Sequence, residues 1–367
     1  MKDNAASGDA LHGSAAGTPD AARLPTVGRS AWLISDGKAG VETQCQAVSD
    51  ALGLAGEFKR VAPRAPWRWI APWGPPDPRE VPGNASSGQD FSPPWPEFII
   101  AGGRMTVPVV RAVRRLAGPQ TFAVFLQDPR VDPDIVDCVW VPAHDRLRGA
   151  RVFTTLTTPH RMTLARLDDA RLRPPQLMDA SVPSRLAILV GGNSRTHRWR
   201  AGDIDAFLAG LTQVAQRFVG VYATVSRRTP DALKAALTRF FDARAAAGAP
   251  GFLWSGEGPN PFSEMLAHAH HLIVTADSAN MVCEACVTGR PVHVFHPSGG
   301  SRKFDRLHAA LTAHGATRRL TADAVDDGAG TGDRADDWTY TPLSATETIA
   351  AEIARRWSIH RESLRAR

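Results

Sequence analysis

The residues best placed for chemistry stand in one stretch, residues 271–296. A strand-length apolar run leads there into a polar turn that ends at Ser278, and a segment of small and apolar residues containing Glu284 follows. Serine is a favoured N-cap, and the free N–H groups of a first helical turn attract phosphate. A carboxylate at Glu284 can accept hydrogen bonds from the two hydroxyls of a ribose. The stretch predicts a βαβ unit that binds a nucleotide; the alternative is an ordinary crossover of a parallel sheet with Glu284 in solvent.

A second such turn follows the first apolar run of the chain, residues 31–34. Residues 35–40 read Ser-Asp-Gly-Lys-Ala-Gly, and a helix is expected after them, at about 41–52. The two glycines permit close approach of the backbone to a ligand, and Lys38 adds a positive charge. The loop matches neither the P-loop nor the dinucleotide-binding pattern. It predicts a turn that faces a substrate or, as the alternative, a tight turn with an exposed lysine.

Four further apolar runs of the first half read as strands, and glycine or polar and charged residues follow each of them. These strands are expected at 98–101, 121–126, 136–141 and 152–154. The carboxyl ends of parallel strands converge on one edge of a sheet. The residues that should meet at this edge are Gly102, Arg104, Asp128, Arg130, His144, Asp145, His160 and Arg161. The pattern therefore predicts one charged cleft.

The second half of the chain repeats this architecture. Its strands are expected at 186–190, 219–224, 252–254, 272–275 and 292–295, and its helices at 201–218, 231–246 and 303–314. Polar loops again follow the strands, and they contain Gly191, Gly192, Asn193, Ser194, Arg227, Arg228 and Asn260. Regular alternation of strands and helices predicts an α/β protein, with two Rossmann-like domains that face each other across a cleft.

Changes in composition suggest the domain boundaries. Residues 1–29 are rich in Ala, Gly, Ser and Asp and are expected to be a disordered tail. The two expected domains are residues 30–180 and 181–340, and residues 341–367 should form a helix that packs back on the first domain. Residues 62–97 are a proline-rich insert that contains four tryptophans. The insert predicts either a surface that rests on a membrane or an excursion that its tryptophans pin to its own domain.

The overall composition limits the class of protein. The chain has 367 residues, of which 43% are hydrophobic and 22% charged, as in a soluble globular protein of two domains. No apolar run has the length of a transmembrane helix, and no signal-peptide pattern precedes residue 30. The net charge of +6 is spread over scattered arginines, which argues against a nucleic-acid partner. Scattered cysteines, with Cys283 and Cys286 expected in a core, fit a reducing cytoplasm. The expected location is cytoplasmic, including peripheral contact with the inner face of the membrane.

The order of several motifs resembles the mitochondrial-fission Elm family, whose bacterial members are grouped with the glycosyltransferases. The motifs are SDGKAG, AGGR, QDPR, VPAHD, TTLTTPHR, GGNSRTHRW, TVSRRTP, GPNPF and TADSANMVCEACVTGRPVHVF, and they extend from about residue 31 to residue 314. The segment around Asp277, Glu284, Gly289 and Pro291 is also similar to the donor-binding signature of GT-B glycosyltransferases. In that fold the carboxyl-terminal domain holds a nucleotide sugar.

The resemblance implies roles for individual residues. On the donor side, the diphosphate is assigned to Gly191, Gly192, Asn193 and Ser194, and the charge of the leaving group is neutralised by Arg227 and Arg228. Asn260 and Phe262 are expected near the nucleoside. Ser278 is expected at the phosphates and Glu284 at the ribose. The acceptor-side residues are Lys38, Arg104, Arg130 and Arg161, and the candidate catalytic bases are Asp36, Asp128 and His144. The first loop departs from many GT-B relatives, which have mainly glycine and histidine where this chain has Asp36 and Lys38.

The resulting prediction is a metal-independent glycosyltransferase with a nucleotide-sugar donor and a lipid-linked or envelope glycan as acceptor. No DxD-like cluster stands in a loop where a metal would bridge a diphosphate, so neither a metal nor a cofactor besides the nucleotide-sugar substrate is expected. Two alternatives stay open. One is a nucleotide-sugar 2-epimerase, which needs no acceptor, and the other is a non-catalytic adaptor like the plant family members linked to mitochondrial division.

Overall fold

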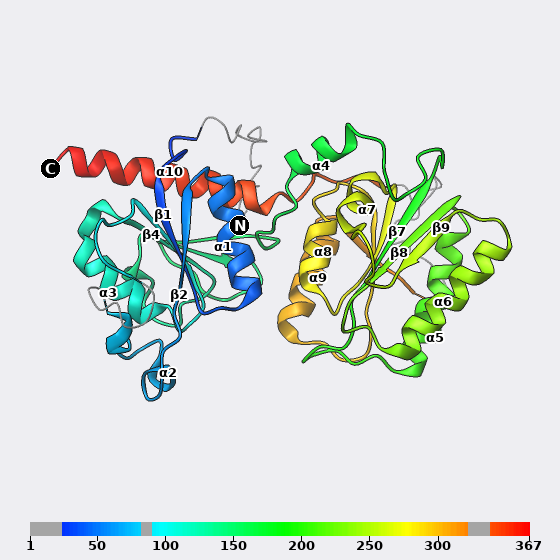
Figure 1. Ribbon diagram of the computed structural model, residues 1–367, viewed down its shortest axis with the longest axis horizontal. Helices are drawn as coiled ribbons and strands as arrows, with labels where there is room; N and C mark the ends of the chain where they lie inside the picture. The colour runs from blue at the N-terminus through cyan, green and yellow to red at the C-terminus, as the bar shows by residue number, and fades with distance from the viewer. Residues whose placement is uncertain (1–23, 82–89, 322–337) are drawn as a thin grey trace, which may run out of the picture.

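The structure is a computed structural model that describes residues 24–81, 90–321 and 338–367. Within these residues the chain forms two six-stranded sheets, each flanked by helices (Figure 1). The strand order is β2-β1-β3-β4-β5-β6 in the first sheet and β12-β11-β10-β7-β8-β9 in the second, and neighbouring strands run parallel. The predicted α/β architecture of two Rossmann-like domains is confirmed.

The first sheet takes most of the amino-terminal half. Its strands are β1 (Ser30–Ser35), β2 (Ala55–Arg60), β3 (Phe98–Gly102), β4 (Phe122–Leu126), β5 (Cys138–Pro142) and β6 (Val152–Thr155). The helices and 3-10 turns between them are α1 (Ala39–Ala51), α2 (Trp67–Ile70), η2 (Pro78–Glu80), α3 (Val107–Ala117), η4 (Gly118–Gln120) and η5 (Pro133–Ile135). Successive residues of a strand point to opposite faces, so Leu33 packs with α1 while Trp32 and Ile34 pack on the α3 side.

The second sheet has the same construction. Its strands are β7 (Arg185–Val190), β8 (Gly220–Val225), β9 (Gly251–Trp254), β10 (His271–Thr275), β11 (Val292–Phe295) and β12 (Thr317–Arg319). Its helices are α5 (Ala201–Ala215), α6 (Asp231–Ala246), α7 (Phe262–His268), α8 (Ala279–Ala285) and α9 (Arg302–Ala313). Both faces of the sheet are covered, which is why the central strands are continuous apolar runs. Leu189 packs with α8 and α9, and its neighbour Ile188 packs with α5 and α6.

Two crossing segments join the domains. The chain leaves β6, runs through α4 (Leu164–Arg171) into the second domain, and returns to α10 (Ala345–Arg365), which lies along the first domain (Figure 1). The backbone N–H of His160 donates to the hydroxyl of Thr346 at 3.0 Å, and that hydroxyl donates to the carbonyl of His160 at 2.8 Å. Trp357 of α10 packs on Phe98 with 5.3 Å between ring centroids. The last helix therefore completes the core of the first domain.

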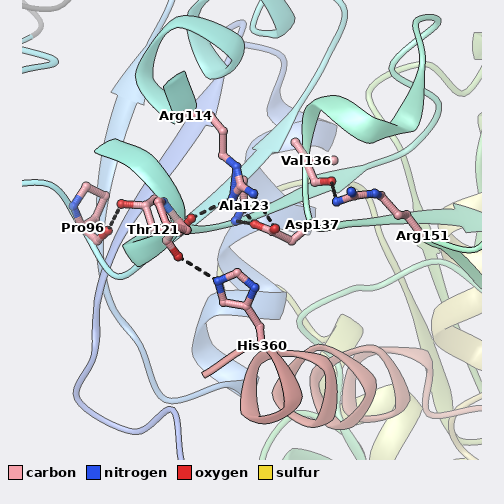
Figure 2. A network of polar contacts seen from close by, with 9 residues as sticks. Pro96, Arg114, Thr121, Ala123, Val136, Asp137, Arg151 and His360 are labelled. Carbon is pink, nitrogen blue, oxygen red and sulfur yellow. Dashed lines mark hydrogen bonds and ion pairs between the residues drawn. The ribbon is translucent and has the colours of Figure 1, made fainter. Parts of the chain in front are cut away.

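Polar contacts fix the amino-terminal ends of the strands in the first sheet (Figure 2). Arg114 of α3 forms an ion pair with Asp137 and donates to the carbonyl of Thr121 at 2.9 Å. A ring nitrogen of His360, on α10, lies 2.7 Å from the carbonyl oxygen of Pro119. These contacts hold α3, β4, β5 and α10 together at the edge opposite the carboxyl ends of the strands.

Some elements differ from the sequence expectation. The sequence does not predict β2, because this edge strand reads Ala-Gly-Glu-Phe-Lys-Arg and buries only Lys59. Residues 24–29 of the expected tail form turns in which the hydroxyl of Thr26 donates to the carbonyl of Leu52 at 2.7 Å, and the rest of that tail lies outside the described residues. The sequence also predicts a loop at 321–336, which lies outside the described residues apart from Thr321.

Candidate functional site

A cavity of about 450 Å³ opens at the carboxyl ends of the first sheet. Five of the predicted residues line it, namely Lys38, Arg104, Asp128, Arg130 and Asp145. Its other lining residues are Val41, Gly103, Gln127, Arg146, Leu147 and Lys303. The prediction that successive strand ends bring charged residues into one place is therefore correct for β1, β3, β4 and β5.

The loop after β4 is held in an unusual conformation. Gln127 has φ 79° and Arg130 has φ 60°, and among the described residues these are the non-glycine residues with positive φ. The carboxylate of Asp128 accepts a hydrogen bond from the N–H of Arg130 at 2.7 Å, which closes this turn. Residues other than glycine rarely adopt such backbone angles unless the surrounding structure compensates for the strain. Residues strained in this way cluster at functional sites. The strain here lies in the wall of the cavity.

The loop after β1 places Asp36 under the cavity floor. Only 3% of the Asp36 side chain is exposed, and it forms an ion pair with the exposed Lys38. Gly103, with φ 90°, covers the carboxylate so closely that a Cβ there would lie 2.7 Å from its atoms. A side chain at this position would displace Asp36, so glycine is required. Asp36 is thus fixed in place, and one of its carboxylate oxygens, Oδ1, has no hydrogen-bond partner among the described residues.

The second domain reaches into the same cavity through the start of α9. Lys303 forms an ion pair of 2.8 Å with Asp145, and Arg306 donates from two nitrogens to the carbonyl of His144 at 2.9 and 3.1 Å. Burial, and next the charge of Lys303, lowers the pKa of His144 to about 4. His144 is therefore neutral at physiological pH. The carboxyl ends of the two sheets meet at this contact.

The cavity is strongly basic. Five cationic side chains line it, against the carboxylates of Asp128 and Asp145. Arg130 and Arg146 are exposed and have no ion-pair partner among the described residues. A site with unpaired arginines and few carboxylates favours an anionic ligand, because guanidinium groups bind phosphate and carboxylate with paired hydrogen bonds.

The backbone N–H groups of the glycine-rich loop after β7 are already hydrogen-bonded within the protein. The N–H groups of Gly191, Gly192, Asn193 and Ser194 all donate within the protein, to Thr275 Oγ1, Asp277 Oδ2, the carbonyl of Arg228 and the carbonyl of His197 respectively. The glycines are required by packing, since a Cβ on Gly192 would lie 2.1 Å from the carbonyl oxygen of Arg228. These four amides are not free to bind a diphosphate in this conformation. In this conformation the four amides hold the loop in place, and the role of these residues at a diphosphate stays a prediction.

Asp277, at the end of β10, is the residue that organises this loop. Its carboxylate accepts from the N–H of Gly192 at 2.5 Å. Burial raises the pKa of Asp277, while the Gly192 hydrogen bond and the charges of Arg228 and His197 lower it. Arg228 also donates to the carbonyl of Asn193 at 3.4 Å. The structure thus places Arg228, a predicted donor-side residue, against the β7 loop.

Glu284 is half-buried on α8 and has no hydrogen-bond or ion-pair partner among the described residues. Burial alone raises its pKa to about 7. Ser278 occupies the N-cap position of α8, but its side chain accepts no hydrogen bond from the helix, and α8 has only seven residues. The predicted capping by Ser278 is therefore wrong. Glu284 remains an ionisable side chain whose oxygens are open to an external donor.

The other donor-side predictions lie after β8 and β9, in loops or, for Phe262, at the start of α7. Arg227 is exposed after β8. The side chain of Asn260 accepts from the N–H of Phe262 at 2.9 Å, and Phe262 packs against the core below α7. No contact joins these residues to Glu284 in the described part of the chain, so their roles at a nucleoside remain predictions.

Arg161 does not lie where the sequence places it. It lines a separate cavity of about 310 Å³, with Asp50 of α1 and Glu347 of α10. The reason is that β6 is the outer strand of its sheet, and the chain after it turns towards α10, where His160 is buried. The expected meeting of His160 and Arg161 with the residues after β4 is therefore wrong.

Sequence reasoning also missed a group of histidines beside the domain contact. His296 follows β11 and His308 lies on α9, with 4.6 Å between their ring centroids. Burial lowers the pKa of His296 to about 3 and that of His308 to about 4, so both rings are neutral. His296 follows a strand end, so the rule that found Asp128 could have found it. Lys303 and Arg306 gave no such signal, because they stand in an ordinary amphipathic helix.

Two features are absent from the described residues. None of their helices has the length and apolar character that crossing a membrane requires. They also contain no group of three or more His, Cys, Asp or Glu side chains arranged to hold a metal ion. Metal-independent chemistry remains a prediction.

Two parallel sheets whose carboxyl ends meet across a domain contact define the GT-B class of two-domain α/β proteins. Within this class the chain belongs to the family described as Mitochondrial fission ELM1, whose model matches residues 39–357. It is 28% identical over 301 residues to Mitochondrial fission protein ELM1 of Arabidopsis thaliana, which covers 76% of this chain and 68% of that protein. The resemblance to the Elm family is confirmed.

Solved structures with this fold include two UDP-GlcNAc 2-epimerases. The enzyme from Methanocaldococcus jannaschii has a TM-score of 0.51 at 10% identity, covering 90% of this chain and 99% of that one. The enzyme from Neisseria meningitidis, bound to UDP-GlcNAc, has a TM-score of 0.51 at 9% identity and covers 89% of this chain and 99% of that one. At such low identity the likeness concerns the fold alone.

Proposed function

We propose that the chain transfers a sugar from a nucleotide-sugar donor, held by the second domain, to an anionic acceptor held in the basic cavity of the first. The observation that carries this proposal is Glu284, a half-buried carboxyl whose pKa is raised to about 7 and which has no partner among the described residues. Such a group is costly unless a ligand pairs with it. The two hydroxyls of a ribose are suitable donors, and solved relatives in fold bind UDP-sugars.

The acceptor side rests on charge. Arg130 and Arg146 are unpaired among the described residues, and Lys38, Arg104 and Lys303 surround the same cavity. A lipid-linked or envelope glycan that carries phosphate would pair with Arg130 and Arg146, whereas a neutral sugar would leave these two arginines without counter-charge. Because Lys303 belongs to the second domain, an anion in the cavity would also contact both domains at once.

Transfer needs a base for the acceptor hydroxyl, and the surroundings of the three candidates support one of them. Asp128 is exposed within the cavity. Asp36 is buried beneath Gly103 and paired with Lys38, and His144 is buried and is not among the residues that line the cavity. We therefore assign the base to Asp128. The acceptor oxygen bonds to the anomeric carbon, the bond from that carbon to the diphosphate oxygen breaks with its electron pair, and the hydroxyl proton passes to Asp128.

The leaving nucleotide diphosphate needs positive charge. Arg227 and Arg228 are exposed beside the β7 loop, and Arg228 lies close enough to Asp277 to lower its pKa. Guanidinium groups in this position stabilise the charge that develops on the departing diphosphate. In this scheme Asp277 holds the loop while Arg227 and Arg228 face the ligand.

The test is thermal unfolding with UDP-, GDP-, ADP-, CMP- and TDP-sugars, on the wild type and on Glu284→Ala. A ligand at about 100 times its Kd adds roughly 2.7 kcal/mol of stability, which is easily measured. Stabilisation by one nucleotide class that is lost in Glu284→Ala supports the donor site. No shift with any member of the panel would contradict it and favour an adaptor without catalysis.

A second measurement tests the reaction and the acceptor side. The stabilising nucleotide sugar is incubated with the protein alone, and isomerisation of the donor without an acceptor would identify a 2-epimerase in place of a transferase. Inorganic pyrophosphate is then used as a probe of the cavity. Arg130→Gln should weaken pyrophosphate binding and leave the nucleotide affinity unchanged, while Arg228→Gln should weaken the nucleotide.

A further inference from the structure

Residues 61–81 form a loop, here called the tryptophan loop, which extends from the carboxyl end of β2 and carries α2 at its tip (Figure 1). Buried polar contacts give it a fixed shape. The carboxylate of Asp77, 1% exposed, accepts from the backbone and guanidinium of Arg64 at 3.0 to 3.1 Å. Glu80 is buried and accepts from the N–H of Ala62. The loop is an ordered projection from the domain.

The loop is also tied to its domain by arginines. Arg104 donates to the carbonyl of Ala71 at 2.8 Å, and Arg111 donates to the carbonyls of Trp73 and Gly74 at 3.2 and 2.5 Å. These bonds hold the backbone and leave the side chains of the tip free. The tip therefore keeps its orientation whether or not anything covers it.

The side chains at the tip are large, apolar and exposed. Trp69 is 68% exposed, Trp73 is 67% exposed and Ile70 is 41% exposed. The interpretation that the tryptophans pin the insert to its own domain is therefore wrong for this pair. It holds for Trp95, which packs edge-on against Trp32 with 5.9 Å between ring centroids. Two tryptophans left in solvent by an ordered loop mark an interaction surface.

The charges around the tip have one sign. The basic residues of the loop and of the neighbouring face of α3 are Arg64, Arg68, Arg79, Arg111 and Arg115. The acidic residues of the loop are Asp77 and Glu80, and both are buried. A groove of about 370 Å³ between the loop and α3 is lined by Trp73, Arg111 and Arg115. Arg68 and Arg115 are exposed and have no ion-pair partner among the described residues.

We propose that this surface docks on an anionic lipid bilayer, with Trp69, Ile70 and Trp73 in the interfacial layer and Arg68 and Arg115 at the lipid phosphates. Tryptophan prefers the boundary between head groups and acyl chains, and arginine is attracted to the negative surface. A protein partner with an apolar patch would use the tryptophans but would need a separate source of negative charge. The bilayer supplies both features over one continuous surface.

The experiment is co-sedimentation of the whole protein with vesicles of phosphatidylcholine, alone or mixed with phosphatidylglycerol. The wild type should bind the mixed vesicles and should be released by high salt. The double variant Trp69→Ala/Trp73→Ala should raise the apparent Kd by at least about tenfold. The double variant Arg68→Gln/Arg115→Gln should raise it by about 25-fold, at roughly fivefold for each arginine.

Matched controls come from exposed residues elsewhere on the chain. Leu172→Ala removes a side chain that is 84% exposed, and Arg239→Gln removes an exposed charge on α6, and both should bind vesicles as the wild type does. Wild-type protein that stays in the supernatant at low salt overturns the proposal, as does unchanged binding by the tryptophan variant. A self-associated wild type that becomes monomeric in this variant, without vesicle binding, would assign the surface to a second copy of the chain.

Discussion

Replacing Glu284 by glutamine should make the empty protein more stable and weaken its binding of a nucleotide. Burial raises the pKa of Glu284 from 4.5 to about 7, and no described residue donates to the carboxylate. Glutamine keeps the shape of the side chain and removes its charge. The substitution therefore separates the cost of the carboxylate in the empty site from its contribution when a ligand is bound.

The magnitude follows from linkage between protonation and folding. Below about pH 4.5 the carboxyl is protonated in both the folded and the unfolded chain, so its ionisation contributes nothing. As the pH rises through the interval between 4.5 and about 7, the unfolded chain releases the proton first, and the folded protein loses stability. Above this interval the loss reaches roughly 3 kcal/mol, and the remaining solvent contact of the side chain reduces this to about 2 kcal/mol.

The assay is urea unfolding of the wild type, Glu284→Gln and the exposed control Glu362→Gln. Glu284→Gln should gain about 2 kcal/mol at about pH 8 and less than about 1 kcal/mol at about pH 5, because the gain exists only where the wild-type carboxyl is ionised. Glu362→Gln should show no gain at either pH. In calorimetric titration with UDP, or with the nucleotide that the panel selects, Glu284→Gln should bind about 10- to 100-fold more weakly, since two charge-assisted hydrogen bonds are lost.

Two results would refute this reasoning in different ways. An unchanged stability of Glu284→Gln at the higher pH would show that the carboxyl is already solvated or paired. A stabilised variant with unchanged nucleotide affinity would show that the carboxyl is desolvated but does not contact the ribose, and the donor-site proposal would lose its main support.

Three further predictions concern other parts of the molecule. Asp128→Asn should reduce sugar transfer by at least about 100-fold and leave nucleotide affinity unchanged, because it removes the proposed base without touching the donor side; initial rates and calorimetry measure the two effects. Gly192→Ala should cost about 3 kcal/mol in urea unfolding, since its Cβ would lie 2.1 Å from the backbone oxygen of Arg228 and two loops must move. Asp137→Asn should cost about 2 kcal/mol, because it breaks the largely buried ion pair with Arg114.

Controls for these variants come from less constrained positions. Gly202→Ala has no atom within 4 Å of the new Cβ, so it should be neutral or slightly stabilising. Asp134→Asn affects an ion pair whose aspartate is 72% exposed and should change stability by less than about 1 kcal/mol. Transfer activity that survives in Asp128→Asn would return the role of base to Asp36 or His144. A stable Gly192→Ala would mean that the β7 loop is more adaptable than its packing indicates.

The carboxyl edge of the first sheet could be predicted because parallel strands impose it. Buried apolar runs identify β1, β3 and β4, and the polar residues that follow must lie at one edge, which placed Lys38, Arg104 and Arg130 in one cavity. The same rule failed for Arg161. It treats all strand ends alike, whereas the chain after the outer strand β6 leaves for the second domain.

Other features depend on contacts that local sequence does not encode. Glycines at 191 and 192 suggest open backbone amides, but those amides donate to Thr275 on β10 and to Asp277 just after it, a pairing that becomes visible only in three dimensions. Lys303 reaches the first-domain cavity only because α9 faces Asp145 across the domain contact. Strand β2 has no apolar run, because an outer strand with exposed faces needs none.

The position of α10 has a consequence for the order in which the protein matures. Residues 345–357 supply Ile349, Ile353 and Trp357 to the core that covers one face of the first sheet. During synthesis these residues emerge after the whole second domain, so the domain that is made first is the last to close its core. Until then Phe98 and its neighbours on that face remain open to chaperones, proteases and other nascent chains. Residues 345–357 therefore shield that face of the first sheet only once they have been made.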